Sequence, residues 1–339
     1  AERAGLMVVE QSVFQQAGTA FMNVVRDQAV VELNVSNEEV LRRQLQATRD
    51  RFEVGEVTRT DVSQAEARLS RAIADRRSAE GDLETSRADY EQVVGMAPGI
   101  LVQPAVLPNL PRSRREAIER SQVDNPEVIQ AIFTHLSATH NVDVINGERL
   151  PSASLVGQLQ RNADTSQFVQ KAYNAQATAQ VVIPLYQSGS VRSRVRQAKQ
   201  VASQRLIQIE EARRAAIESA TAGWEQLSAT RNRIQALEAE VQSQEIALDG
   251  VKQEALVGTR TVLEVLNAEQ ELLNAKVNLV AARRDEVVAA LSLASAVGLL
   301  AAEPLELDVP RYDVRAHYER VRGAWFGTDV GSPWRPTDQ

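Results

Sequence analysis

Residues 52–72 read FEVGEVTRTDVSQAEARLSRA, and residues 255–275 read ALVGTRTVLEVLNAEQELLNA. The second stretch aligns with the first, without a gap, when the numbering is shifted by 203 positions, and eight aligned residues are then identical. The match continues at the same shift on both sides of these stretches. We therefore interpret residues 20–95 and 223–298 as two copies of one structural unit.

Each copy carries the signals of a helical hairpin. Gly55 in the first copy and Gly258 in the second suit the left-handed residue that often follows a helix end. The pattern Thr-x-x-Asp follows at 58–61, and Thr-x-x-Glu follows at 261–264. Both are capping-box patterns, which start a helix by satisfying its free backbone N–H groups. The glycine turns are therefore predicted to be the tips of two hairpins.

Residues at seven-residue spacing run through the helices that follow these turns. Val265, Leu272 and Leu279 form one series, and the small residues Ala65, Ala72 and Ala79 form another. Such spacing keeps one seam facing a neighbouring helix as the two supercoil. The expected fold class is mainly α with a small β part, built on two duplicated long antiparallel coiled-coil hairpins.

Helix lengths suggest how the chain is divided. The proline-free stretch 191–254 would form a helix of about 96 Å, and two shorter helices stacked end to end would reach a similar length. We divide the chain into six segments. They are a first hairpin 1–95 with its tip at 55–61, a linker 96–125, a helix 126–147, a β-hairpin 150–187, a second hairpin 188–298 with its tip at 256–264, and a tail 299–339.

Alternation of apolar and polar residues predicts strands at 152–161 and 175–186. The pattern alone fits either a hairpin of a membrane β-barrel or a soluble hairpin half-buried on a core. Helices of nearly 100 Å offer no globular core for such a hairpin, which favours the barrel. Two strands cannot close a barrel, and open sheet edges are not tolerated in lipid. Closure would therefore come from other chains or from sequence outside this one.

Composition excludes several function classes. The formal net charge of −7 argues against a nucleic-acid partner, which needs a basic face. The chain has no cysteine, and its three histidines are not spaced as a helical metal pair. We find no nucleophile or phosphate-binding motif and expect no enzyme activity, cofactor or metal. The apolar run 287–302 is shorter than the ~20 residues that a membrane helix needs.

Four motifs together resemble the TolC-type outer-membrane channel family, over essentially the whole chain. They are VGTRTVLEVLNAEQELLNA, its copy VGEVTRTDVSQAEARL, the helix start NPEV and the strand end IPLYQSG. The resemblance implies a homotrimer, in which an outer-membrane β-barrel in contact with lipid continues into a trimeric α-barrel. That α-barrel would be a periplasmic tunnel holding most of the chain, with 96–125 and 299–339 in an equatorial layer.

The same resemblance implies the exit duct of a tripartite efflux pump or a type I secretion system in a Gram-negative cell. Its partners would be a periplasmic adaptor (membrane fusion protein) and an inner-membrane pump or ABC transporter. Family members carry four strands per subunit, whereas two are predicted here. We therefore expect that about 100 N-terminal residues are missing from this sequence, a length that follows from an ordinary two-repeat architecture.

The resemblance also assigns a gate to the hairpin tips, opened by iris-like movement of helices. The gate residues carried over by position are Thr60, Asp61, Arg260, Glu264 and Asn267. We expect a charge-assisted bond from Arg260 to Asp61. We expect Glu264 to form a cation-attracting ring, weakened because Asn267 stands where some relatives have a second acid. Helix capping alone explains Glu264 equally well and explains Asp61 better.

The tips are also where an adaptor would dock. The expected contact residues are Val54, Gly55, Glu56, Val257, Gly258 and Thr259. The alternative function is a structural coiled-coil scaffold of the cell envelope. A scaffold explains the seven-residue spacing and the caps, but not the alternating strands, and it should stay soluble without detergent.

Overall fold

The computed structural model describes residues 2–104, 109–166, 169–305 and 314–323. The protein is mostly helical, with one two-stranded sheet in this part of the chain. The elements are α1 (Glu2–Glu53), α2 (Arg59–Val94), α3 (Arg114–Asp124), α4 (Pro126–Gly147), β1 (Ser152–Ser166), β2 (Val169–Val182), α5 (Ser190–Leu256), α6 (Val262–Ala296) and α7 (Val314–Arg322). None of the helices in the described ranges combines the length and the apolar character needed to cross a membrane.

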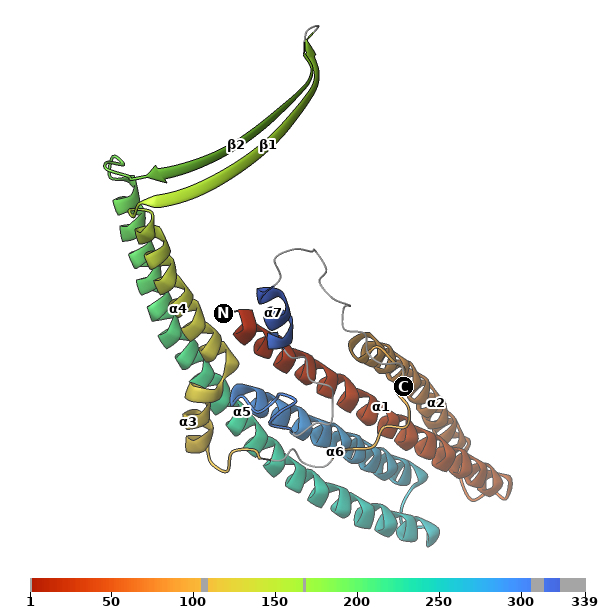
Figure 1. Cartoon of the computed structure of the whole chain (residues 1–339). Coiled ribbons are helices and arrows are strands. Elements are labelled where there is room, and N and C mark those ends of the chain that lie inside the picture. The colour runs from red at the N-terminus through yellow and green to blue at the C-terminus, as the bar shows by residue number, and fades with distance from the viewer. Residues whose placement is uncertain (1, 105–108, 167–168, 306–313, 324–339) are drawn as a thin grey trace.

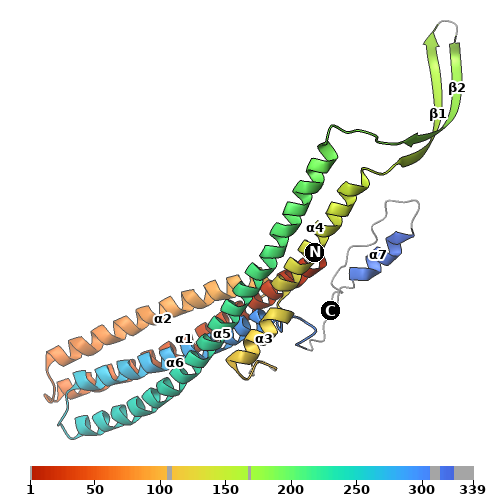
Figure 2. The same cartoon turned by 90° about the vertical axis from the view of Figure 1, so that its left-hand side faces the viewer.

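Two long helical hairpins lie side by side and form one end of the molecule (Figure 1). Helix α1 packs against α2, and the second half of α5 packs against α6. Contacts between α1 and α6 join the two hairpins into a bundle (Figure 2). The expected pair of antiparallel hairpins is therefore present.

The first half of α5 leaves the bundle and pairs with α4. Together α4 and α5 rise away from the bundle and carry β1 and β2 at their far end (Figure 2). The single helix α5 is 67 residues long and contains the whole stretch expected to be one helix. It therefore connects both ends of the molecule.

Small residues form the buried seam of each hairpin. Ala65, Ala72 and Ala79 on α2 are buried at seven-residue spacing, as predicted. On α6, Val265 of the predicted series is buried, but Leu272 and Leu279 are only partly covered, and Ala275 and Ala282 are buried instead. Alanine lets two helices approach closely, so its side chain is fully covered, while a larger neighbour extends past the seam. Beyond Val265, the buried seam of α6 therefore follows the alanines rather than the predicted leucines.

The joint between α3 and α4 is fixed against the end of α6. Asn125 donates from Nδ2 to the carbonyl of Ala296 at 2.9 Å, and its Oδ1 accepts from the N–H of Glu127 at 2.9 Å. At Gly298, which has φ of 77°, a Cβ would lie 2.1 Å from the carbonyl oxygen of Asp124. The backbones are too close there for any larger residue. This contact sets the direction in which α4 and the first half of α5 leave the bundle.

Helix α3 lies within the segment expected to be a linker and was not among the predicted elements. Its first turn is capped by Ser113, whose side chain accepts from the N–H of Glu116 at 3.2 Å. Of the tail that follows α6, residues 306–313 and 324–339 lie outside the described residues, so the predicted equatorial role of the tail is not tested there.

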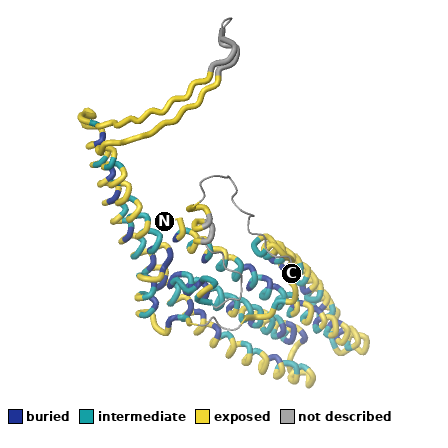
Figure 3. The backbone as a smooth tube through the Cα atoms, viewed as in Figure 1, coloured by how far each residue is buried: buried dark blue, intermediate teal, exposed yellow. Residues whose placement is uncertain are grey.

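The two strands form an antiparallel ribbon with one apolar and one polar face. Leu155 pairs with Ala179 and Leu159 pairs with Ala175, whereas the alternate positions are mostly polar, with Val156 and Val182 among the apolar exceptions. The apolar face is not covered: Leu155 is 79% exposed and Leu159 is 88% exposed (Figure 3). The described part of this chain therefore provides no core on which the ribbon is half-buried.

The ribbon ends differ from the prediction. Strand β2 was expected to continue to residue 186, but it ends at Val182. Pro184 follows two residues later and has no N–H to donate to the strand ladder. The segment between β2 and α5 is therefore a connection that turns the chain from the ribbon into the helix.

Candidate functional site at the hairpin tips

Both hairpins turn at a glycine in the left-handed conformation. Gly55 has φ of 83° and Gly258 has φ of 81°. The chain closes with backbone hydrogen bonds from Glu56 to Arg51 at 2.9 Å and from Thr259 to Glu254 at 3.0 Å. A residue with a Cβ is strained at such a φ, so the duplicated glycines are explained by the turn itself. The predicted tips are confirmed as turns.

The second helix of each hairpin starts with a complete capping box. In the first, Thr58 Oγ1 accepts from the N–H of Asp61 at 3.2 Å, and Asp61 accepts from the N–H of Thr58 at 2.9 Å. In the second, Thr261 and Glu264 exchange the same two bonds at 3.3 Å and 2.8 Å. The predicted caps are therefore confirmed, and both acids have a structural role before any role in a gate.

The expected bond from Arg260 to Asp61 is not formed within this chain. Arg260 donates instead to Glu254 at 2.7 Å and to Glu264 at 2.7 Å. Both acids belong to the same hairpin as Arg260, and they flank it on either side of the turn. These two carboxylates accept the hydrogen bonds of the Arg260 guanidinium. The Arg260 side chain is therefore held within its own hairpin rather than bonded to the other one. Within the single chain, these two bonds therefore take the place of the predicted link.

The electrostatics of this tip follow from the same contacts. The backbone N–H of Thr261, then Arg260 and the Thr261 hydroxyl, hold the pKa of Glu264 at about 2, below the usual 4.5. The two carboxylates that accept from Arg260 raise the pKa of its guanidinium. Glu264 is therefore ionised at neutral pH, but its charge is paired with that of Arg260.

The other residues predicted for the gate and for adaptor contact are exposed at or near the two turns. Thr60 is exposed on the first turn of α2, and Asn267 is exposed on the second turn of α6. The six predicted adaptor-contact residues are all exposed, and the two tips present apolar side chains at corresponding positions of the repeat, Val54 and Val257.

A hydrogen bond that sequence analysis missed joins the two hairpins near their tips. Arg68 on α2 donates from Nη2 to Asn267 Oδ1 on α6 at 2.7 Å. Apolar residues from both hairpins pack close by, and they include Leu41 on α1, Ala65 on α2 and Leu266 on α6. Asn267 therefore contacts the other hairpin directly. No feature of the sequence around Arg68 distinguishes it from the other arginines of α2.

A second missed feature is an ion pair repeated in both hairpins. Arg49 pairs with Glu66 at 2.5 Å, and Lys252 pairs with Glu269 at 2.8 Å. The two pairs occupy equivalent positions, since each residue of the second lies 203 positions after its counterpart in the first. We call this repeated ion pair a brace. Glu66 and Glu269 are identical in the aligned stretches, so the alignment of the two copies contained the signal from which the brace could have been predicted.

Comparison with known proteins gives a consistent result. Residues 117–299 match the family described as "Outer membrane efflux protein". The chain is 34% identical over 330 residues to the outer membrane efflux protein BepC of Brucella suis, a match that covers 96% of this chain and 72% of BepC. It is 27% identical over 307 residues to the outer membrane protein TolC of Escherichia coli, covering 86% of this chain and 62% of TolC.

The fold is also similar to a solved outer membrane channel. The match to the crystal structure of CmeC from Campylobacter jejuni has a TM-score of 0.69 at 17% identity, and it covers 87% of this chain and 66% of CmeC. At that identity the likeness concerns the fold alone. The fold match and the sequence matches nevertheless point to one class of protein.

Proposed function

The chain belongs to the outer membrane efflux protein family, and from that premise we propose that it forms a homotrimeric channel with a periplasmic tunnel. The channel is the exit duct of a tripartite efflux pump or of a type I secretion system. The single observation that carries this proposal is the shape of the chain: two slender helical hairpins at one end and a ribbon with an uncovered apolar face at the other.

The ribbon supports a place in the outer membrane. Its exposed leucines on one face and its polar residues on the other match the lipid side and the lumen side of a barrel wall. An open two-stranded edge is not tolerated in lipid, so the ribbon requires neighbouring strands. The helices then lie on the periplasmic side.

Uncovered apolar residues on the helices support assembly with further copies. Leu6, Val9 and Val13 recur on α1, and Ile132 and Leu136 recur on α4, and all five are exposed in the single chain. A helix with an apolar stripe lowers its free energy by burying that stripe against another helix. Three copies arranged around an axis would cover these stripes and enclose a tunnel.

The tips support a gate and a docking surface. Thr60, Asp61, Arg260, Glu264 and Asn267 lie at the closed end of the tunnel in this proposal. The exposed valines of the turns are offered to the helical hairpins of a periplasmic adaptor, which would connect the channel to an inner-membrane pump or ABC transporter. Opening separates the hairpins, and separation breaks the bond between Arg68 and Asn267.

Electrical recording tests the proposal directly. The protein expressed from its natural gene should form trimers by light scattering in detergent, and it should produce discrete conductance steps in a planar lipid bilayer. A scaffold, which is the alternative function, would remain soluble without detergent and would produce no conductance steps in the bilayer. A soluble protein without conductance steps would therefore overturn the channel.

A further inference from the structure

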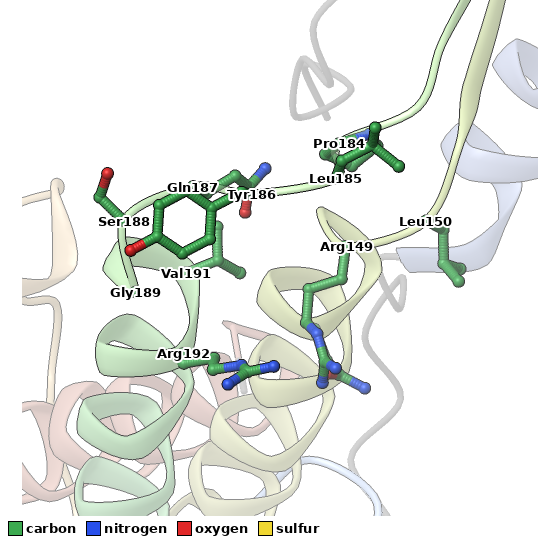
Figure 4. Close-up of a pocket in the computed structure, with 11 residues that line it drawn as sticks. Arg149, Leu150, Pro184, Leu185, Tyr186, Gln187, Ser188, Gly189, Val191 and Arg192 are labelled. Atoms are coloured by element: carbon green, nitrogen blue, oxygen red, sulfur yellow. The ribbon is translucent and has the colours of Figure 1, made fainter.

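A cavity lies where the ribbon meets the helices. It has a volume of about 660 Å³ and is bounded by the end of α4, the start of α5 and the two connections that lead to β1 and β2 (Figure 4). The residues that matter for its chemistry are Arg149, Arg192, Leu150, Leu185 and Tyr186. This cavity is at the opposite end of the helices from the hairpin tips.

Two arginines give the cavity its charge. Arg149 lies just after the end of α4 and Arg192 lies in the first turn of α5, and both line the same cavity (Figure 4). Arg149 donates to the side chain of Asn146 at 3.2 Å, and Arg192 has no hydrogen bond or ion pair with the described part of the chain. No acid lies in the first turn of α5. The cavity is therefore lined by two positive charges, and no carboxylate is among its lining residues.

A nearby arginine, Arg194, differs from Arg192 because it is paired with a carboxylate. Arg194, two residues after Arg192, is bonded to both carboxylate oxygens of Glu148. Glu148 is therefore occupied, and it is not among the residues that line the cavity. Two guanidinium groups repel one another when they share a site, so an anion between them lowers the free energy of the site.

Apolar side chains border the same cavity. Leu150 is 66% exposed, Leu185 is 92% exposed and Tyr186 is 87% exposed. Large apolar and aromatic side chains beside arginines are typical of the boundary between a membrane and water. The cavity therefore combines two cationic side chains with exposed apolar surface, and the apolar surface suits acyl chains rather than a free inorganic anion.

The position of the cavity identifies the source of the anion. If the ribbon crosses the outer membrane, its helical end lies at the periplasmic surface, where the phosphates of the inner leaflet are found. We propose that Arg149 and Arg192 bind the phosphate of an anionic phospholipid, with Leu150, Leu185 and Tyr186 beside its glycerol and acyl region. This inference rests on the proposed function, because it needs the ribbon to be in the membrane.

Lipid retention tests the site. The protein expressed from its natural gene is purified in detergent with equal amounts of phosphatidylglycerol and phosphatidylcholine, and native mass spectrometry measures the bound lipid. The test variant carries Arg149→Gln and Arg192→Gln. The matched control carries Arg213→Gln and Arg231→Gln, which remove the same charge from α5 away from the cavity. Arg149 and Arg192 are both exposed, so their loss should leave folding intact.

The wild type and the control should retain phosphatidylglycerol in preference to phosphatidylcholine. In the test variant, the ratio of bound phosphatidylglycerol to bound phosphatidylcholine should fall by about thirtyfold. This is the factor expected when two arginines near an anionic membrane surface are removed. Equal retention by the test variant and the wild type would overturn the site. An equal loss in the control would also overturn it, since surface charge alone would then explain the binding. Displacement of the lipid by inorganic phosphate would overturn the lipid assignment.

The same samples distinguish failure of this site from failure of the channel. Trimer mass and single-channel conductance are measured on the wild type beside lipid retention. If conductance is present and lipid retention does not depend on the two arginines, the lipid site is wrong and the channel stands. If neither trimer nor conductance is found, the proposed function fails, and this inference fails with it.

Discussion

Breaking the hydrogen bond between Arg68 and Asn267 tests whether the two hairpins must separate for the channel to open. Arg68→Ala removes the guanidinium that lies 2.7 Å from Asn267 Oδ1 and that joins α2 to α6. An exposed bond of this kind contributes about 1 kcal/mol to the closed state. If three subunits open together, the loss is about 3 kcal/mol, or about a hundredfold in the ratio of open to closed channels.

Single-channel recording in planar bilayers measures that ratio. Arg71→Ala is the matched control, because Arg71 lies one turn further along α2 and its ion pair, with Asp75 at 3.7 Å, stays within the helix. Asn267→Ala should open the channel as much as Arg68→Ala does. The double variant should add nothing further, because two residues that act through one bond are not additive.

The apolar cluster near the tips remains intact in these variants, so the channel should open more often without staying open. Two results would refute the reasoning. One is an open fraction for Arg68→Ala that equals the open fraction of the Arg71→Ala control. The other is full additivity of the Arg68 and Asn267 substitutions, because the two side chains would then act independently of their bond.

Three further predictions concern the tips and the braces above them. The Glu264 carboxyl should titrate near pH 2 when followed by NMR. Because its pKa is lowered in the folded state, the stability that this carboxylate contributes should be complete at neutral pH and should fall as the pH drops from about 4.5 toward 2. Gly258→Ala should lower the free energy of unfolding by about 1 kcal/mol, because φ is 81° there. Its control Gly250→Ala, at an open position inside α5 near the same tip, should instead raise the free energy of unfolding by about 0.5–1 kcal/mol in the same denaturant titration. Glu269→Ala should destabilise the protein by about 1.5–3 kcal/mol in that titration, because it removes a charge-assisted bond to Lys252 from a carboxylate whose side chain is only 8% exposed. Glu66→Ala, at the equivalent position with a side chain 47% exposed, should cost less than about 1 kcal/mol.

The parts of the fold that depend on neighbouring residues could be predicted from the sequence. The turn at Gly258 and the cap at Thr261 are each set by a few adjacent positions, so the local pattern determines them. The duplication then predicted the second hairpin, because a repeated sequence pattern implies a repeated structural unit. The end of β2 at Val182 was also predictable, since Pro184 has no N–H to donate, but the predicted strand followed the alternation of side chains past this proline.

The partners of long side chains could not be predicted in the same way. Arg260 was expected to reach Asp61, but two acids of its own hairpin lie within reach of its guanidinium and bind it first. Arg68 and Asn267 meet because of how one hairpin lies against the other, and that placement is set by many weak packing contacts. Sequence patterns determine which face of a helix is buried, but they do not determine which of several charged neighbours a flexible arginine selects.

The distribution of contacts indicates where the molecule is free to move. Each hairpin is braced internally near its tip, by Arg49 with Glu66 and by Lys252 with Glu269, so its two helices should move together. At the far end of the bundle, the backbone contact between Gly298 and Asp124 leaves no space for sliding. The contact of α2 with α6 near the tips depends on one exposed hydrogen bond and a small apolar cluster. We therefore expect the tips to separate as rigid hairpins that pivot about the joint at α3 and α4, because α2 and α6 are held together near the tips by so few interactions.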